Sequence, residues 1–406
     1  MVNKSYEQAQ STGLYEKPAS LRGKYDNVRR FWEDEITCLF LKPYLEGIRR
    51  QAESEERGVR ILDLGCGSGD GYELLTSVAD RKAGPEASDN RVLPGNAIER
   101  YLGIDINPGL LEQGRAVFRK NERVQFQEGS FSEGLPVDEG EKPFDLYLST
   151  YGTFSHCTDS VATKLLADIA GHADKGAIVV ADWLGWHAFE WQDLWTETLA
   201  EDQVMQYIIS YLTDPDEKEN MEFEPFELRL MNKETIQNIV NNASEQSAKG
   251  LKLLETFDRS VFIGRHMETG DYFSKPQPLR RVMNSLLEPG RRTPLEQAFV
   301  EYAPREGFKA DNNYFQRIVQ CWNSLVQYTL ELMSSQHVFP PSGPPALQRA
   351  ASTMQQLVQA TAILDLEDAR ANIIEPQLTY LLRGFEAELQ EGEGRAHGIV
   401  AVMQVI

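Results

Sequence analysis

A glycine-rich turn after the first apolar run of the chain carries the clearest chemical signal in the sequence. The run at 59–64 contains Asp63 near its end, and Gly65, Gly67 and Gly69 follow at alternate positions. Glycine lets the backbone turn tightly and approach a ligand closely, and a helix that starts here presents free N–H groups. Asp63 suits a ligand with a cationic amino group. The pattern therefore indicates a ligand site, with a tight turn alone as the alternative.

Two familiar glycine-loop patterns do not fit this turn. A dinucleotide site needs G-x-G-x-x-G, but its third glycine position holds Asp70 when counted from Gly65 and Tyr72 when counted from Gly67. A phosphate-binding loop needs a lysine after its last glycine, and none follows here. The turn therefore does not predict a pyrophosphate or triphosphate ligand.

Strand-like and helix-like patterns alternate around the turn, which predicts βαβ units and a parallel sheet. We therefore expect an α/β fold with a Rossmann-like, doubly wound sheet. The expected strands are 59–64, 101–106, 124–127, 144–149 and 177–182, with two more near 223–231 and 251–264. The expected helices between them are 69–78, 109–119, 160–170 and 233–240.

The composition along the chain predicts three regions. They are an N-terminal arm and helical cap (1–58, polar over 1–20), a central sheet domain (59–269) and a mainly helical C-terminal region (270–406). Two segments interrupt the central domain. Residues 81–98, rich in Gly and Pro, predict an exposed loop, and residues 185–222, aromatic and then acidic, predict a helical lid.

The C-terminal region is expected to contain helices at 294–302, 313–336 and 346–364. It ends in the apolar run GIVAVMQVI at 398–406. An apolar, β-prone end with unpaired edge groups invites pairing. We therefore predict that this end docks onto another strand or onto a second subunit.

The DLGCGSG stretch at 63–69 resembles motif I of the class I S-adenosylmethionine-dependent methyltransferases. The resemblance continues in the same order over about 59–265. YLGIDINPGLLEQGR at 101–115 resembles the second strand of the family, whose closing acidic residue, here Asp105, holds both ribose hydroxyls. The resemblance thus covers the central domain and not the C-terminal region.

Three later segments extend the resemblance. The family usually has Gly-Asp where this chain has Gly129-Ser130, which leaves the adenine contact to a hydroxyl or to backbone groups. FDLYLSTYGTFSH at 144–156 resembles the fourth strand, whose end lies beside the transferable methyl group. GAIVVADWLGW at 176–186 resembles the fifth.

The resemblance implies S-adenosyl-L-methionine as cofactor and S-adenosyl-L-homocysteine as product, and no metal is expected. Many small-molecule methyltransferases place a helix before the first strand to close over the cofactor. Arg29 or Arg30 would there pair with the methionyl carboxylate, with a solvated surface as the alternative. The predicted cofactor-binding residues are Tyr25, Arg30, Asp63, Gly65, Cys66, Gly67, Gly69, Asp105, Ile106, Ser130, Phe131, Thr150 and Tyr151.

His156 is the histidine that the motif order places next to the methyl donor, and we predict it as the catalytic general base. A structural, hydrogen-bonded histidine is the alternative, and His187 is then the next candidate for the base. Trp183, Trp186 and His187 are predicted to bind the substrate, because aromatic residues cluster after the fifth strand. Such a cluster also forms ordinary protein cores.

The charge and the motifs bear on the methyl acceptor. Lys and Arg number 41 against 62 Asp and Glu, for a formal net charge of -21, and such a field repels phosphate backbones. The [DN]-P-P-[YF] signature is absent, and its place holds residues 149–152. We therefore expect a small-molecule acceptor, methylated on O, N or C, and no nucleic acid. The alternatives are a protein acceptor, or a non-catalytic S-adenosylmethionine-binding module that acts through its helical C-terminal region.

The four cysteines of this 406-residue chain are far apart, which favours neither a disulfide framework nor a zinc site. The N-terminus is polar, and the late apolar run is too short for a membrane helix of about 20 residues. We expect a cytoplasmic protein without a membrane partner. The C-terminal region is expected either to form one side of the acceptor site or to mediate homodimerisation.

Overall fold

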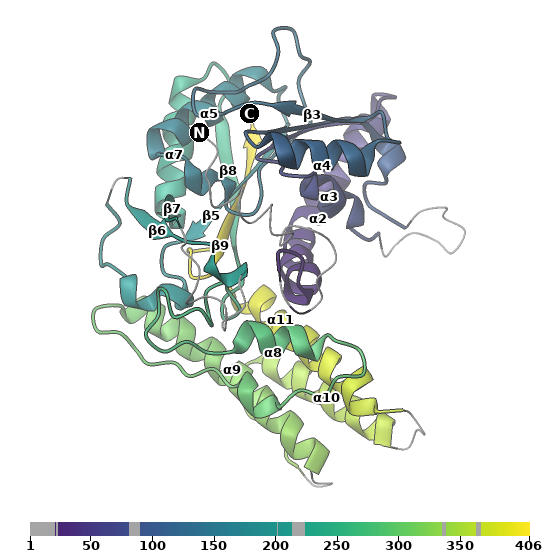
Figure 1. Ribbon diagram of the computed structural model, residues 1–406, viewed down its shortest axis with the longest axis vertical. Helices are drawn as coiled ribbons and strands as arrows, with labels where there is room; N and C mark the ends of the chain where they lie inside the picture. The colour runs from purple at the N-terminus through teal and green to yellow at the C-terminus, as the bar shows by residue number, and fades with distance from the viewer. Residues whose placement is uncertain are drawn as a thin grey trace.

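The computed structural model describes residues 21, 23–80, 90–200, 202–212, 224–334, 338–362 and 367–406. A mixed sheet forms the centre of this part of the chain, with helices on both of its faces (Figure 1). Its strands are β1 (Val59–Leu64), β2 (Ile98–Asp105), β3 (Val124–Glu128), β4 (Leu146–Leu148), β5 (Ile178–Gly185), β6 (Val204–Tyr207), β7 (Phe226–Met231), β8 (Leu251–Arg259) and β9 (Gly398–Val405). The predicted α/β class with a Rossmann-like sheet is confirmed.

The helices alternate with the strands in the first two thirds of the chain and follow one another after β8. They are α2 (Asp34–Ser54), α3 (Asp70–Ser77), α4 (Pro108–Phe118), α5 (Asp159–His172), α7 (Lys233–Gln246), α8 (Leu279–Leu286), α9 (Lys309–Ser334), α10 (Pro345–Ala362) and α11 (Glu375–Leu389). A π-helical turn, η1 (Arg29–Glu33), leads directly into α2. The predicted polar arm at 1–20 lies outside the described residues.

The parallel strands lie in the order β3-β2-β1-β4-β5. The chain therefore moves outward from β1 to β3 and then returns to the other side of β1. In open α/β sheets, ligands bind beyond the carboxyl ends of the strands at such a reversal. The loops after β1 and β4 thus flank the expected ligand crevice.

The two faces of the sheet carry separate cores, because successive strand residues point to opposite sides. On one face, Ile61 and Val180 belong to a core with α2 residues such as Leu45. On the other face, Leu62 and Val179 pack with α5 and α7. Burial on both faces explains why these strands are almost continuously apolar.

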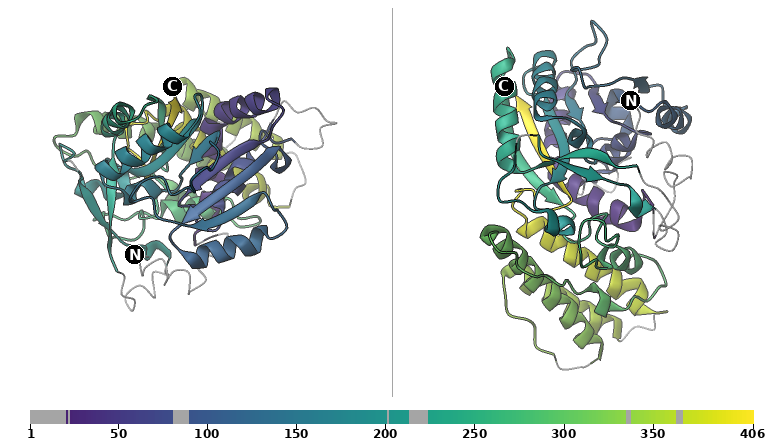
Figure 2. Two further views of the ribbon diagram at one scale, coloured as in Figure 1. Left: turned by 90° about the horizontal axis from the view of Figure 1, so that it is seen from above. Right: turned by 60° about the vertical axis from the view of Figure 1, so that its left-hand side comes forward.

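The last strand, β9, lies inside the sheet and not at its edge. It pairs antiparallel with β5 on one side and with β8 on the other (Figure 2). The prediction that the apolar C-terminal run docks onto another strand is confirmed. Since Arg259 of β8 pairs with Gly398 of β9, residues 260–397 form an insertion between two adjacent strands.

The inserted helices α8–α11 pack together as a layer beside the end of the sheet (Figure 1). This layer also holds the N-terminal segment. The Trp32 ring packs against Trp322 of α9 in a tilted arrangement, at 5.7 Å between ring centroids, and its indole N–H donates to Glu386 of α11 at 3.0 Å. The N-terminal segment and the insertion therefore form one packed unit at the end of the sheet.

Two predicted helical segments are wrong. The segment after β5 forms the 3₁₀ turn η4 (Phe189–Leu194), the strand β6 and the 3₁₀ turn η5 (Ser210–Leu212) instead of a helical lid, because its tryptophans are buried in the core. Its acidic run and the tip of the loop at 81–98 lie outside the described residues. The expected helix at 294–302 is only the short turn η6 (Leu295–Ala298), since the α9 side chains Trp322 and Asn323 bond its backbone.

Candidate functional site

A cavity of about 560 Å³ lies beyond the carboxyl ends of β1, β4 and β5. Its two ends differ in chemistry. The glycine end is lined by Gly65, Gly67, Asp105, Ile106, Ser130 and Phe131. The ionic end is lined by Arg29, Glu33, Asp182, Arg259, Arg265 and His397. Thr150 and Tyr151, which follow β4, line the cavity between these ends, because β4 lies between β1 and β5 in the sheet.

The glycines of the turn are required by conformation and by space. Gly65 and Gly67 have φ values of 71° and 54°, which disfavour any residue with a Cβ. A Cβ on Gly65 would lie 2.3 Å from Cγ2 of Thr153. A Cβ on Gly67 would make only van der Waals contacts, at 3.8 Å from Nζ of Lys24 and 4.0 Å from Cδ1 of Leu110, so the need for glycine here is conformational. Gly67 borders the cavity, and its missing side chain lets a ligand approach the backbone.

Asp105 closes β2 and faces the same cavity. Its Oδ2 accepts a hydrogen bond from the N–H of Gly67 at 2.9 Å, and its Oδ1 accepts one from the N–H of Asn107 at 2.8 Å. Asn107 caps α4 by accepting from the N–H groups of Gly109 and Leu110. These contacts fix the carboxylate while each oxygen keeps a lone pair for a ligand hydroxyl.

Asp63 lies beneath the turn and is buried. Its Oδ2 accepts a very short hydrogen bond from the hydroxyl of Tyr101, and its Oδ1 has no partner among the described residues. The pKa of Asp63 is raised to about 7, mainly by burial and in part by the nearby negative charges of Asp70 and Asp105. A cationic ligand group beside Oδ1 would favour the ionised form.

The N-terminal segment covers the cavity through Asp70, the first residue of α3. Lys24 pairs with Asp70 at 2.8 Å, and the hydroxyl of Tyr25 donates to it at 2.6 Å. Lys24 lines the cavity, whereas Tyr25 does not. Asp70 stays ionised although it is buried, because Lys24 and Arg29 lower its pKa. This ion cluster ties the N-terminal segment to the glycine turn.

The arginine that faces the cavity is Arg29, whereas Arg30 is exposed and lies outside the lining. The Arg29 guanidinium lies 3.4 Å from the centre of the Tyr151 ring and pairs with Asp34 at 2.9 Å. The Tyr151 hydroxyl donates to the same carboxylate at 3.1 Å. The π-helical turn that starts at Arg29 thereby turns this side chain inward.

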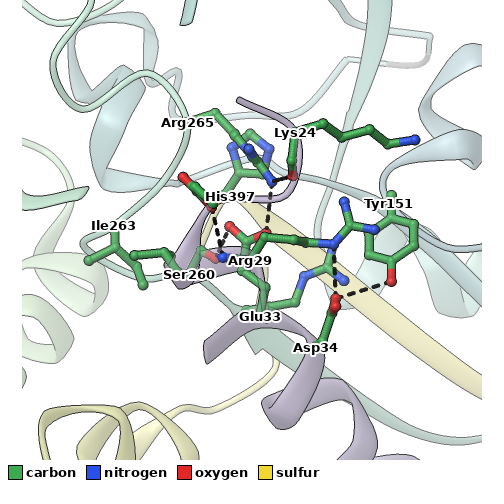
Figure 3. A network of polar contacts seen from close by, with 12 residues as sticks. Lys24, Arg29, Glu33, Asp34, Tyr151, Ser260, Ile263, Arg265 and His397 are labelled. Atoms are coloured by element: carbon green, nitrogen blue, oxygen red, sulfur yellow. Dashed lines mark hydrogen bonds and ion pairs between the residues drawn. The ribbon is translucent and has the colours of Figure 1, made fainter. Parts of the chain in front are cut away.

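The ionic end brings together residues that the sequence motifs did not indicate (Figure 3). Arg259, at the end of β8, pairs with Asp182 of β5 at 2.7 Å. Arg265 pairs with Glu33 at 3.3 Å, and the Arg280 guanidinium, behind the lining, reaches Glu33 at 2.6 Å. The only sequence signal for this set is charge at the ends of apolar strands, as in Asp182 and Arg259.

His156 lines the cavity with its ring stacked on Phe226, at 5.7 Å between ring centroids. The side chain is exposed at the cavity wall, although protein atoms crowd around the ring. Desolvation by these atoms lowers the pKa of His156 to about 4. The imidazole is therefore neutral at pH 7 but only weakly basic.

The predicted substrate residues of the fifth-strand loop do not reach the cavity. Trp183 is fully buried against Phe154, on the core face of the sheet. Trp186 stacks on His187 at 4.2 Å between ring centroids. His187 pairs with Asp311 of α9 at 3.0 Å, so this cluster binds the insertion to the sheet.

Other predicted residues surround the glycine end. Cys66 is buried and borders the cavity. Gly69 is the N-cap residue of α3, with φ 98°. The hydroxyl of Ser130 lies 2.9 Å from that of Ser132, within hydrogen-bond distance. Within the described ranges, no group of three or more His, Cys, Asp or Glu residues could hold a metal ion. No helix in those ranges has the length and apolar character needed to cross a membrane.

Comparison with known proteins agrees with this geometry. Residues 61–176 match the sequence model of a family described as a methyltransferase domain. The chain carries a class I S-adenosylmethionine-dependent methyltransferase domain. The matched segment of this methyltransferase contains the glycine turn, Asp105 and the strand β4, which Thr150 follows. Its cofactor is S-adenosyl-L-methionine.

Solved structures show weaker similarity to the methyltransferase. One is an S-adenosylmethionine-dependent methyltransferase from Clostridium acetobutylicum, with 12% identity and a TM-score of 0.36, covering 63% of this chain and 91% of that chain. Another is the CcbJ methyltransferase from Streptomyces caelestis, with 14% identity and a TM-score of 0.38, covering 62% of this chain and 89% of that chain. No curated protein sequence matches the chain.

The glycine end fits the cofactor on three observations of this structure. Gly67 leaves the space that a side chain would take, Asp105 holds two fixed carboxylate oxygens, and Asp63 has an unpartnered oxygen. A ligand with two adjacent hydroxyls and a cationic amino group supplies matching donors. The cofactor carries both groups.

Proposed function

We propose that the methyltransferase acts on a small-molecule acceptor, which it methylates on O, N or C by in-line transfer. One observation carries this proposal: the ionic end of the cavity is built from side chains that are themselves buried. Asp182 is 0% exposed, Arg259 3% and Arg265 9%. An acceptor must therefore enter the protein interior. The cavity of about 560 Å³ lies within the range of about 300–1,000 Å³ that is usual for small-ligand sites.

A protein acceptor fits this end of the cavity less well. The segments that cover it, Arg29–Glu33 from the N-terminus and the residues after β8, are locked by buried ion pairs. An extended peptide would need an open groove across these segments. A protein substrate therefore remains the second candidate only if its methylated side chain alone enters the cavity.

We assign the cofactor contacts from the same geometry. Asp105 would bind the ribose hydroxyls, while Ser130 and Phe131 would border the adenine. Gly65, Gly67 and Asp63 would border the methionyl group. Thr150 and Tyr151 would then flank the sulfonium methyl group, because they lie between the two ends of the cavity.

Bound S-adenosyl-L-methionine supplies an already activated methyl group. The protein then contributes alignment of the acceptor and exclusion of water, effects that together lower a barrier by about 7–11 kcal/mol. The buried arginine and carboxylate side chains of the ionic end are held by each other and need not reorganise when an acceptor enters. They can therefore fix the acceptor's polar groups in line with the methyl group.

Methyl-labelled S-adenosyl-L-methionine tests the acceptor class directly. We would incubate the full chain with the labelled cofactor and either a deproteinised metabolite extract or the protein fraction of the same cells. We expect label in the metabolite fraction, and we expect Asp105→Ala to abolish most of it at limiting cofactor. Label that appears only in the protein fraction would support the second candidate instead.

A further inference from the structure

His397 occupies a position that no motif marks, at the point where β9 enters the sheet. Its N–H donates to the carbonyl of Ser260 after β8, and its carbonyl accepts from the N–H of Gly185 at the end of β5, both at 3.1 Å. The backbone of His397 is therefore held from both sides, at the carboxyl end of β5. Its side chain lines the ionic end of the cavity.

A buried carboxylate orients the His397 ring. Oε1 of Glu190 lies 2.5 Å from Nδ1 of His397, and Oε2 of Glu190 accepts from the backbone N–H of His266 at 2.6 Å. Gly264 makes room for this carboxylate, since a Cβ there would lie 2.2 Å from Oε1. Burial alone would raise the pKa of Glu190, but the adjacent His397 lowers it overall, so the carboxylate is ionised at neutral pH.

This contact decides which ring nitrogen is free. An ionised carboxylate only accepts hydrogen bonds, so Nδ1 of a neutral His397 carries the proton and Nε2 carries the lone pair. Nε2 has no hydrogen-bond partner among the residues that the structure describes. The Trp191 ring, 5.6 Å away between centroids, packs beside the imidazole and restricts its rotation.

We infer that His397 is the general base of the methyl transfer, and that Glu190 is the positioning residue that holds it. This inference rests on the proposed function and narrows the acceptor to one that must lose a proton, such as a hydroxyl or an ammonium group. Nε2 takes the acceptor proton, the freed electron pair forms the bond to the methyl carbon, and the carbon–sulfur bond breaks with its electron pair left on sulfur. The products are the methylated acceptor, S-adenosyl-L-homocysteine and an imidazolium paired with Glu190.

The surroundings of His397 support a base that gains positive charge. Asp182 of β5 and Glu190 of η4 are carboxylates that interact with it electrostatically. His266 interacts with it as well, and the guanidinium of Arg259, which also lines the cavity, is paired with Asp182. A proton taken from the acceptor would therefore arrive beside two carboxylates.

Two other histidines are weaker candidates for the base. His156 borders the cavity, but desolvation lowers its pKa to about 4, which makes it a weak base. His187 has a carboxylate partner, but both ring nitrogens are used, one by Asp311 and the other by the carbonyl of Thr196 at 3.3 Å. His397, in contrast, lines the cavity and is oriented through Nδ1 by the carboxylate of Glu190.

Steady-state kinetics, measured with the metabolite fraction that becomes labelled, test whether His397 acts as the general base. We expect His397→Gln to lower kcat by ~10²–10⁴-fold, the usual span for a general base, with S-adenosyl-L-homocysteine affinity within about twofold of the parent. The rise of the parent kcat with pH should disappear in this variant. Glu190→Gln should keep the rise but move it to lower pH, since loss of a carboxylate disfavours the imidazolium.

His187→Gln is the matched control, because it removes a histidine–carboxylate pair outside the cavity. Its kcat and pH profile should match those of the parent. A His397→Gln variant that keeps the parent kcat and pH profile would overturn the inference but leave the small-molecule assignment standing. A parent enzyme that labels no metabolite would instead contradict the proposed function.

Nuclear magnetic resonance tests the orientation without any acceptor. We would label histidine with ¹⁵N, saturate the full chain with S-adenosyl-L-homocysteine, and assign His397 from its loss in His397→Gln. We expect the neutral ring to be protonated on Nδ1 in the parent and to lose this preference in Glu190→Gln. Protonation on Nε2 in the parent would overturn the inference, even if the kinetic variants were too unstable to assay.

Discussion

The two ends of the cavity are built in opposite ways. The glycine end takes its residues from one stretch, about 63–131, in which each strand is followed by the loop that completes the site. The ionic end takes its residues from the N-terminal segment, β5, β8 and the entry to β9, which are far apart in the chain. The glycine end thus depends on local geometry, whereas the ionic end depends on how distant segments meet.

The two ends also differ in what holds them together. Backbone N–H groups fix Asp105 at the glycine end. At the ionic end, Glu33 is surrounded by arginines, which lower its pKa well below the usual value despite burial. Each of these charges depends on its partners, because an unpaired buried charge is costly. The ionic end should therefore be the more sensitive of the two to single substitutions.

Removal of β9 should produce the largest effect, since it dismantles the ionic end. Deleting residues 398–406 exposes the pairing edges of β5 and β8 and removes six buried apolar side chains from the two cores, five of them larger than alanine. At about 1.5–3 kcal/mol for each, their loss rivals the total stability of about 5–15 kcal/mol of a typical domain. We expect no cooperative thermal unfolding and strong light scattering. A monodisperse protein with the parent melting temperature would contradict the position of β9.

Loss of one buried arginine should be the next largest effect. Arg280 pairs with Asp26 at 2.7 Å and with Glu33 at 2.6 Å. Arg280→Ala leaves Asp26 buried without this guanidinium and leaves Glu33 paired with Arg265 alone. We expect a loss of ~3–5 kcal/mol in the free energy of unfolding, measured with urea. The neighbouring Arg281→Ala, at an exposed pair with Glu268, should cost ~1 kcal/mol or less. Equal losses of stability in Arg280→Ala and Arg281→Ala would contradict the expectation that buried ion pairs make the ionic end sensitive to substitution.

Asp105→Ala tests the glycine end and should affect binding more than folding. The charged hydrogen bonds to the ribose would be lost, and we expect S-adenosyl-L-homocysteine affinity to fall by ~1.5–3 kcal/mol in calorimetry. The urea midpoint should change little, because Asp105 bonds only backbone groups of the loops. Glu128→Ala, at the end of the adjacent β3, is the control and should bind like the parent.

His156→Gln should have the smallest effect on catalysis. A histidine whose pKa lies near 4 is neutral at and around pH 7 and is only weakly basic. We therefore expect kcat to fall less than tenfold and the dependence of kcat on pH to stay unchanged. The unfolded chain protonates this residue near pH 6.5, above the folded pKa. The parent should therefore lose stability between about pH 6.5 and pH 4, and His156→Gln should lose less. Urea unfolding at both ends of this range measures the difference.

Sequence reasoning succeeded where the chain folds locally. The glycine turn, Asp105 and the strand order through β5 follow from short patterns, because each strand, turn and helix start lies within a few residues. It failed for the segment after β5, where the aromatic residues predicted a lid. There, Trp186 and Trp195 pack against the insertion, and no local pattern distinguishes a buried indole from an exposed one.

At the N-terminus, the predicted arginine and the arginine that lines the cavity are adjacent residues. The sequence favoured Arg30, but the π-helical turn changes the rotation per residue and directs Arg29 inward. The pairing of Tyr25 with Asp70 likewise depends on a contact across 45 residues. Periodicity alone could not have chosen between adjacent arginines.

The sequence by itself determined the glycine end of the cavity in this methyltransferase, because glycines and a strand-end aspartate act through the backbone on which they sit. Only the tertiary structure decided the ionic end. β9 pairs with β8 so that Arg259 lies opposite Gly398, and this pairing brings His397 to the cavity from the far end of the insertion. A hydrogen-bonded register between distant strands is set by the packing of the whole sheet, and no short pattern in either strand encodes it.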